Sequence, residues 1–153
     1  MSLEAGPKSE ICNCQAVRQA ARHMTQFYDR FMAPTGLRAS QFSILVRLRR
    51  NGLTTINALA ADLLLDRTTL GRNLLPLQRD GLVTIARGRA DRRSREVSLT
   101  ADGVARMRAG IKRWAAAQAQ FEAAFGSGRS AELRALLQAV VTSDLGVPAA
   151  VPA

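Results

Sequence analysis

Apolar side chains recur every three or four residues along most of the chain, the spacing of helices that bury one face. The stripes predict helices over residues 17–33, 40–51, 56–64, 67–80 and 101–125, with a last helix after the segment 126–130. Breakers coincide with the ends of these segments, notably Pro34, Gly36, Gly52 and Gly81. Asp66 and Thr100 stand where helix caps are expected.

The pattern changes once, between residues 82 and 100. Apolar and polar side chains alternate there in LVTIAR (82–87) and REVSLT (95–100), which indicates two strands joined by an arginine-rich turn. The sequence therefore predicts a mainly α fold with one small β-hairpin.

The side chains expected in the core follow from the stripes. In the second helix they are Phe42, Leu45, Val46 and Leu48, and in the fourth Leu70, Leu74 and Leu77. The long helix repeats apolar positions every seven residues, apart from one glutamine, at Val104, Met107, Ile111, Trp114, Gln118, Phe121 and Phe125. The last helix carries Leu133, Leu136, Leu137, Val140 and Val141 on one side. A seam with this seven-residue period favours packing along another helix.

Charge changes this picture, because the chain carries a formal net charge of +10 and a pI of about 11.4. Nearly all of the cations are arginines, and five of them stand within residues 87–95. Guanidinium groups this close repel one another and remain protonated at neutral pH, so they favour a polyanionic partner.

The order helix, short helix, capped helix, glycine and basic hairpin is typical of a winged helix-turn-helix, which reads duplex DNA. On this interpretation one face of the capped helix meets DNA through Arg67, Thr68, Thr69 and Arg72. The hairpin tip, or wing, adds Arg89, Asp91, Arg92 and Arg93. We expect the Asp91 carboxylate to pair with Arg93 or Arg89 and to orient that side chain.

These residues resemble the MarR family of dimeric winged-helix regulators. The segments LAADLLLDRTTLGRNLLPLQRDGLV and DRRSREVSLTADG carry the likeness, which runs from the first helix through the last. The family's wing motif falls on Asp91 and Arg93, and its recognition-helix threonine and arginine fall on Thr69 and Arg72. The resemblance implies a two-fold dimer with intertwined terminal helices, a recognition helix in the major groove and a wing in the minor groove. It also implies release from DNA by a small acid, a phenol or an oxidant.

The expected organisation follows from this. Residues 36–100 form the DNA-binding region, residues 11–35 and 101–145 form a helical dimerisation region, and residues 1–10 and 146–153 are flexible ends. The partners are a second copy of the chain and a near-palindromic DNA operator. No signal peptide pattern or bilayer-spanning run is present, so we expect a cytoplasmic protein with no membrane contact.

Two features depart from the family pattern. Pro76 lies inside the recognition helix, where we expect a bend because proline removes one hydrogen bond and clashes with the carbonyl of Arg72. Cys12 and Cys14 stand two residues apart at the head of the first helix, about 200° around it from each other, so a disulfide between subunits is more accessible than one within a chain. The hypothesis is that oxidation there links two subunits and lowers DNA affinity.

A small-molecule pocket is the other candidate sensor. It would lie between the first, second and long helices, although ordinary core packing explains most of the same residues. Its candidate walls are Tyr28, Phe31, Met32, Phe42 and Trp114, with His23 or Arg30 near enough to meet a carboxylate.

Other classes of function fit less well. His23 is the only histidine, and no catalytic residues, cofactor or metal site are indicated. Two alternatives remain open at this stage: a winged-helix protein-interaction module, and a non-specific DNA-binding protein without an effector.

Overall fold

The computed structural model describes residues 12–146, and the two expected flexible ends therefore lie almost wholly outside the described residues. Its elements are α1 (Asn13–Met32), the short 3-10 helix η1 (Ala33–Thr35), α2 (Ala39–Asn51), β1 (Thr54–Thr55), α3 (Ile56–Asp62), α4 (Arg67–Arg79), β2 (Val83–Arg87), β3 (Arg95–Leu99), α5 (Ala101–Phe125) and α6 (Ser127–Thr142). The chain divides into two compact units, one up to Ala117 and one from Gln118 onward. This order confirms the expected helices and hairpin, except that α6 begins at Ser127, inside the segment 126–130 that was expected to precede it.

Threonine side chains cap the starts of two helices. The Thr55 hydroxyl accepts a hydrogen bond from the amide of Ala58 at the start of α3, at 3.1 Å. Thr100 does the same for α5 by accepting from the amide of Gly103 at 2.9 Å, as the sequence predicted. Each cap satisfies an amide that has no partner within its own helix.

The core of the first unit lies between α2, α3, α4 and the hairpin, and it takes in one side of α5. Leu70, Leu74 and Leu77 are at most 1% exposed, which confirms the predicted stripe of α4. Val46 was expected in this core but is 40% exposed, and Ile44 is buried instead. Val46 stands two residues from Ile44, about 200° around the helix, so the two side chains cannot share a face.

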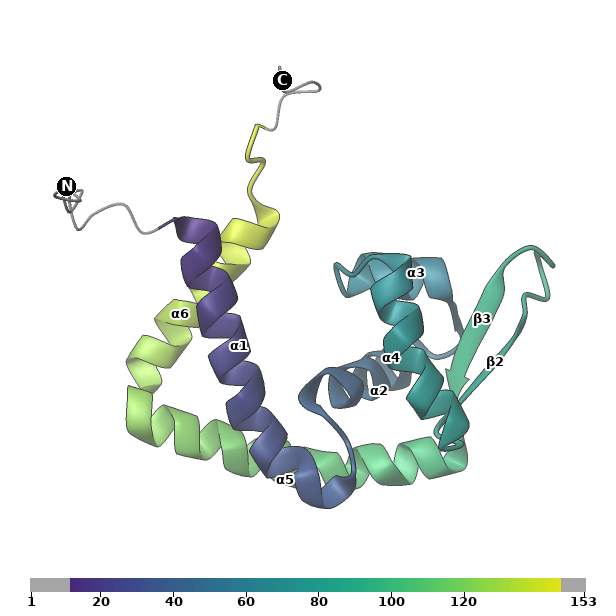
Figure 1. Ribbon diagram of the computed structural model, residues 1–153, viewed down its shortest axis with the longest axis horizontal. Coiled ribbons are helices and arrows are strands. Elements are labelled where there is room, and N and C mark those ends of the chain that lie inside the picture. The colour runs from purple at the N-terminus through teal and green to yellow at the C-terminus, as the bar shows by residue number, and fades with distance from the viewer. Residues whose placement is uncertain (1–11, 147–153) are drawn as a thin grey trace, which may run out of the picture. The chain divides into compact units, whose positions relative to one another are not determined.

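The sheet has three strands in the order β1-β3-β2, all antiparallel. In the hairpin, Ile85 pairs with Val97 and Thr84 with Ser98. β1 was not foreseen, because a strand of two residues is too short to show alternation. It ties the start of α3 to the central strand through the pair Thr54 and Val97. Figure 1 shows α4 lying beside this hairpin.

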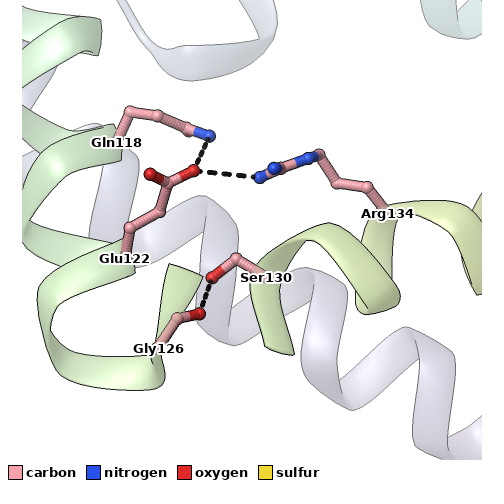
Figure 2. Close-up of polar contacts among 5 residues, drawn as sticks. All are labelled: Gln118, Glu122, Gly126, Ser130 and Arg134. Carbon is pink, nitrogen blue, oxygen red and sulfur yellow. Dashed lines mark hydrogen bonds and ion pairs between the residues drawn. The ribbon is translucent and has the colours of Figure 1, made fainter. Parts of the chain in front are cut away.

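The second unit begins with the last turns of α5, which end at Phe125. Gly126 follows with φ 98°, a backbone conformation that favours glycine. Beyond this residue, the buried Ser130 hydroxyl donates to the Gly126 carbonyl at 2.7 Å. Glu122 accepts from Arg134 of α6 at 3.2 Å and from Gln118 at 3.4 Å (Figure 2). These contacts fix the turn between α5 and α6.

Apolar side chains remain exposed on the described part of α6. They include Leu136 (61%), Leu137 (42%), Val140 (52%) and Val141 (56%). The sequence placed these residues on one side of the last helix, and no other residue within 12–146 buries them.

Candidate nucleic-acid interface

The first turn of α4 is organised by Asp66. Its carboxylate accepts from the Thr69 amide at 2.8 Å and from the Thr69 hydroxyl at 2.5 Å. These hydrogen bonds, the hydroxyl's first, hold the pKa of the Asp66 carboxyl below its usual range. The cap is therefore ionised at neutral pH, where its negative charge also suits the N-terminal end of a helix.

The N-terminal half of α4 has an exposed surface. Arg67, Thr68 and Arg72 are exposed there, as predicted, whereas Thr69 is half-buried and its hydroxyl donates to Asp66. The Asn73 amide donates to the Thr69 carbonyl at 2.9 Å, which adds a side-chain bond within the helix. Thus three of the four predicted α4 contacts are free to meet a partner directly.

Pro76 does not end α4, which continues to Arg79 as one element (Figure 1). The amide of Asp80 bonds the Pro76 carbonyl at 3.0 Å, so the last turn closes behind the proline. The part of α4 that carries Arg67 and Arg72 precedes this position. The sequence-predicted bend stays a prediction.

The tip of the wing is folded by Asp91 and not by an arginine pair. The Asp91 carboxylate accepts from the Arg93 amide at 2.9 Å, and its carbonyl accepts from the Ser94 hydroxyl at 2.7 Å. Among residues 12–146 no guanidinium forms an ion pair with Asp91, so the expected pairing with Arg93 or Arg89 is wrong. An aspartate often accepts a hydrogen bond from the amide two residues further along and so closes a turn. The Asp91 carboxylate has this role in the wing.

Gly88 completes the turn, because there is no room for a side chain. A Cβ atom at this position would overlap the Ser94 hydroxyl and lie 2.5 Å from the Asp91 carbonyl oxygen. The chain direction at the tip is therefore fixed by close backbone approach.

The arginines of the wing are exposed, and their guanidinium groups form no ion pair with any residue in 12–146. They are Arg87, Arg89, Arg92, Arg93 and Arg95. The ion pairs that the described residues form all lie elsewhere, as in Arg47–Asp62 and Arg79–Asp80. Unpaired guanidiniums beside an exposed helix face make a surface suited to an anionic partner with phosphate groups.

An apolar cleft of about 690 Å³ lies in the first unit, between the end of α1, α2 and α5. Its lining contains three residues that the sequence singled out, Met32, Phe42 and Trp114, together with Ala39, Ser43, Val46, Arg49, Arg50, Met107 and Ile111. Gly110 lets the Phe42 ring pack closely against α5, since a Cβ there would lie 2.6 Å from that ring. No sequence pattern pointed to the two arginines, because they sit on the outer side of α2.

The remaining candidates for this cleft do not line it. Tyr28 and Phe31 pack on Phe27 of their own helix, with ring centroids 5.4 and 5.2 Å apart respectively. His23 and Arg30 are exposed, and His23 lies nine residues before Met32, roughly 14 Å along a helix at 1.5 Å per residue. Helical spacing alone could not tell which side of α1 faces the cleft.

Cys12 and Cys14 are exposed free thiols at the start of α1. None of the helices in residues 12–146 is long and apolar enough to cross a bilayer. In the same range, no group of three or more His, Cys, Asp or Glu side chains could hold a metal ion.

No protein-family model and no curated protein matches the chain. Solved structures do match. The transcriptional regulator MosR of M. tuberculosis, solved in complex with DNA, is 38% identical, over 85% of this chain and 96% of MosR, with a TM-score of 0.73. CouR, a transcriptional repressor bound to a 23-mer DNA duplex, is 25% identical, over 92% of this chain and 99% of CouR, with a TM-score of 0.79.

A variant of MarR from E. coli, complexed with operator DNA, shares the fold at 22% identity, over 83% of this chain and 91% of MarR, with a TM-score of 0.74. The match to MosR extends over nearly all of that protein. The chain belongs to the MarR family of winged helix-turn-helix transcriptional regulators.

Proposed function

We propose that this chain is a dimeric, sequence-specific DNA-binding regulator that acts as a repressor. The observation that carries the proposal is the row of unpaired wing arginines beside the exposed face of α4. Two similar proteins, MosR and CouR, were solved with DNA, and CouR is a repressor, which supports the same role here.

Each element has a distinct task in this proposal. The N-terminal half of α4 enters the major groove, where Arg72 reads a base edge and Thr68 meets a phosphate or a thymine methyl group. The wing, with Arg89, Arg92 and Arg93, follows the backbone into the minor groove. Asp91 acts indirectly, because it shapes the tip through the Arg93 amide.

We call the winged helix-turn-helix, residues 36–100, the reading head. We assign the dimer interface to regions outside it. Residues 11–35 and 101–145 pair two copies, so that two α4 helices face half-sites about one helical turn apart. The exposed apolar residues of α6 support this assignment, since large apolar patches on a lone subunit usually mark an interface.

Arg72→Ala tests the reading role. It is expected to weaken binding to the preferred site by about 1–3 kcal/mol and to flatten the preference at one base position, because a bidentate contact to a base is lost. The measurement is selection of bound sequences from a random DNA pool, followed by titration of the selected and the scrambled site.

Arg79→Ala is the matched control, since Arg79 stands at the far end of the same helix and is paired with Asp80. It removes the same charge and is expected to leave the selected sequence unchanged. Equal loss of preference in both variants would count against sequence reading by α4. A selection that enriches no site would favour non-specific binding, and no DNA binding at all would favour a protein-interaction module.

The apolar cleft is the proposed effector site, for a small aromatic acid or phenol. Its walls offer Trp114 and Phe42 to a ring, and Arg49 and Arg50 to a carboxylate. Trp114 is the only tryptophan in the chain, so tryptophan fluorescence comes from a side chain that lines this cleft. Titration with hydroxybenzoates is expected to change that fluorescence and to release DNA over the same concentration range.

Val46→Phe is expected to fill part of the cleft and weaken hydroxybenzoate binding at least tenfold, with DNA binding retained. Leu53→Phe is the control, because Leu53 is also exposed (57%) but lies outside the cleft.

An oxidant acting on Cys12 or Cys14 is the alternative signal, supported by the exposure of both thiols. Peroxide would then produce a dimer on a non-reducing gel and release DNA without changing Trp114 fluorescence.

A further inference from the structure

A small polar notch lies where the turn of the wing, at the start of β3, meets the starts of α3 and α4. Its polar lining comes from Thr55 and Asn57, from Arg67 of α4, and from Arg93, Ser94 and Arg95 of the wing. The notch measures about 70 Å³, against about 690 Å³ for the apolar cleft, so it has room for one small group and not for a ring system.

The notch gathers positive charge without any carboxylate. Three of its seven lining residues are arginines, and none of them forms an ion pair with another described residue. Asp66 precedes Arg67 but is bonded to Thr69. Glu96 follows Arg95, and alternation along a strand puts its side chain on the opposite face of the hairpin.

The register of the hairpin adds to this charge. Arg95 is paired directly with Arg87 across the two strands, and like charges in such a pair are destabilising. The two arginines extend the face that carries Ile85 and Val97 in the core. Arg95 is held by the strand and Arg67 by the first turn of α4, so the backbone positions are set before any ligand arrives.

We propose that this notch binds one backbone phosphate of duplex DNA, clamped by Arg67 and Arg93 with Arg95. The inference rests on the proposed DNA-binding function and deepens it. Guanidinium forks match phosphate oxygens, and the Asn57 amide and Ser94 hydroxyl add neutral polar groups to the site. One phosphate held between α4 and the wing fixes the register of both on the duplex, so Arg67 and Arg95 position the protein and Arg72 reads bases.

Arg95→Gln and Arg87→Gln form a matched pair, since they remove equal charge from partner residues of one hairpin and only Arg95 lines the notch. Arg95→Gln is expected to weaken binding to the selected site about tenfold. It should also reduce the slope of log affinity against log salt by about 0.9, the value for one phosphate contact, without changing the selected sequence. Arg87→Gln is expected to weaken binding less than about threefold. Equal effects of the two variants would overturn the proposal that the notch binds a phosphate.

The phosphate itself is identified with duplexes in which single phosphates are replaced by neutral methylphosphonates. One position in each half-site is expected to weaken the wild type about tenfold and to cost Arg95→Gln clearly less, because that variant has already lost one of the three guanidiniums that hold this phosphate. If every position weakens both proteins equally, no single phosphate occupies the notch and the proposal fails, while the DNA-binding function stands.

Inorganic phosphate allows the notch to be tested in the absence of DNA. Titration of the wild type is expected to shift the Nε–H resonances of Arg67, Arg93 and Arg95 together and saturably, with Arg87 unmoved. A uniform, non-saturating drift of all arginines would overturn the site. Saturable phosphate binding in a protein that selects no DNA would overturn the duplex as ligand and the proposed function together, and would leave a free-anion site.

Discussion

Gly103→Ala is expected to destabilise the first unit by about 3 kcal/mol or more, and to lower Tm by roughly 6–12 °C. A Cβ atom at Gly103 would overlap the Leu82 carbonyl oxygen and lie 3.1 Å from a Leu99 methyl carbon. The obstacle is backbone that cannot rotate away. The carbonyl of Leu82 also accepts from the Thr100 amide at 3.1 Å, so moving it breaks the bond that holds the start of α5 to the hairpin.

Gly71→Ala is the matched control, because Gly71 lies inside a helix and a Cβ there meets nothing within 4 Å. It is expected to stabilise the protein by about 0.5–1 kcal/mol, since alanine restricts the unfolded chain more than glycine does. Thermal melts of both variants, followed by circular dichroism at one protein concentration, test the pair. A loss of less than about 1 kcal/mol in Gly103→Ala would contradict the close packing of α5 on Leu82.

The local features of the reading head could be predicted from the sequence because each depends on neighbouring residues. These features are the Asp66 cap, the leucine stripe of α4 and the two-residue period of the hairpin, and each involves residues that are close together in the sequence. The resemblance to known regulators rests on the same short segments, which explains why the fold could be predicted from the sequence.

The predictions that failed concern features that depend on residues far apart in the sequence or on the detailed geometry of a turn. Val46 fits a helical stripe as well as Ile44 does, and only the packing of α2 decides which side is buried. For Asp91, proximity to arginines suggested an ion pair, whereas the turn at the wing tip gave its carboxylate a nearer donor in the Arg93 amide. The notch joins residues 55–57, 67 and 93–95, and no linear pattern links those segments.

The expected dimer explains why the reading head could act on a palindrome, and α6 offers the sharpest test of it. Leu136→Glu with Val140→Glu puts two charges on the exposed apolar side of this helix, where the parent side chains are 61% and 52% exposed. Because neither side chain is buried by the described part of its own chain, the variant is expected to keep its helix content. Charges buried in an interface without partners are costly, so the dimer is expected to dissociate at least 100-fold more readily, a loss of about 2.7 kcal/mol.

DNA affinity is then expected to fall by about 10²–10⁴-fold, because the second reading head no longer binds at high effective concentration. Ala135→Glu with Gln138→Glu is the control, since these exposed positions carry the same charge change on the opposite side of α6. Sedimentation velocity and titration of the selected operator measure both steps. A wild type that sediments as a monomer, or a dimer that survives the apolar-side variant, would remove α6 from the interface and leave each reading head to bind its half-site alone.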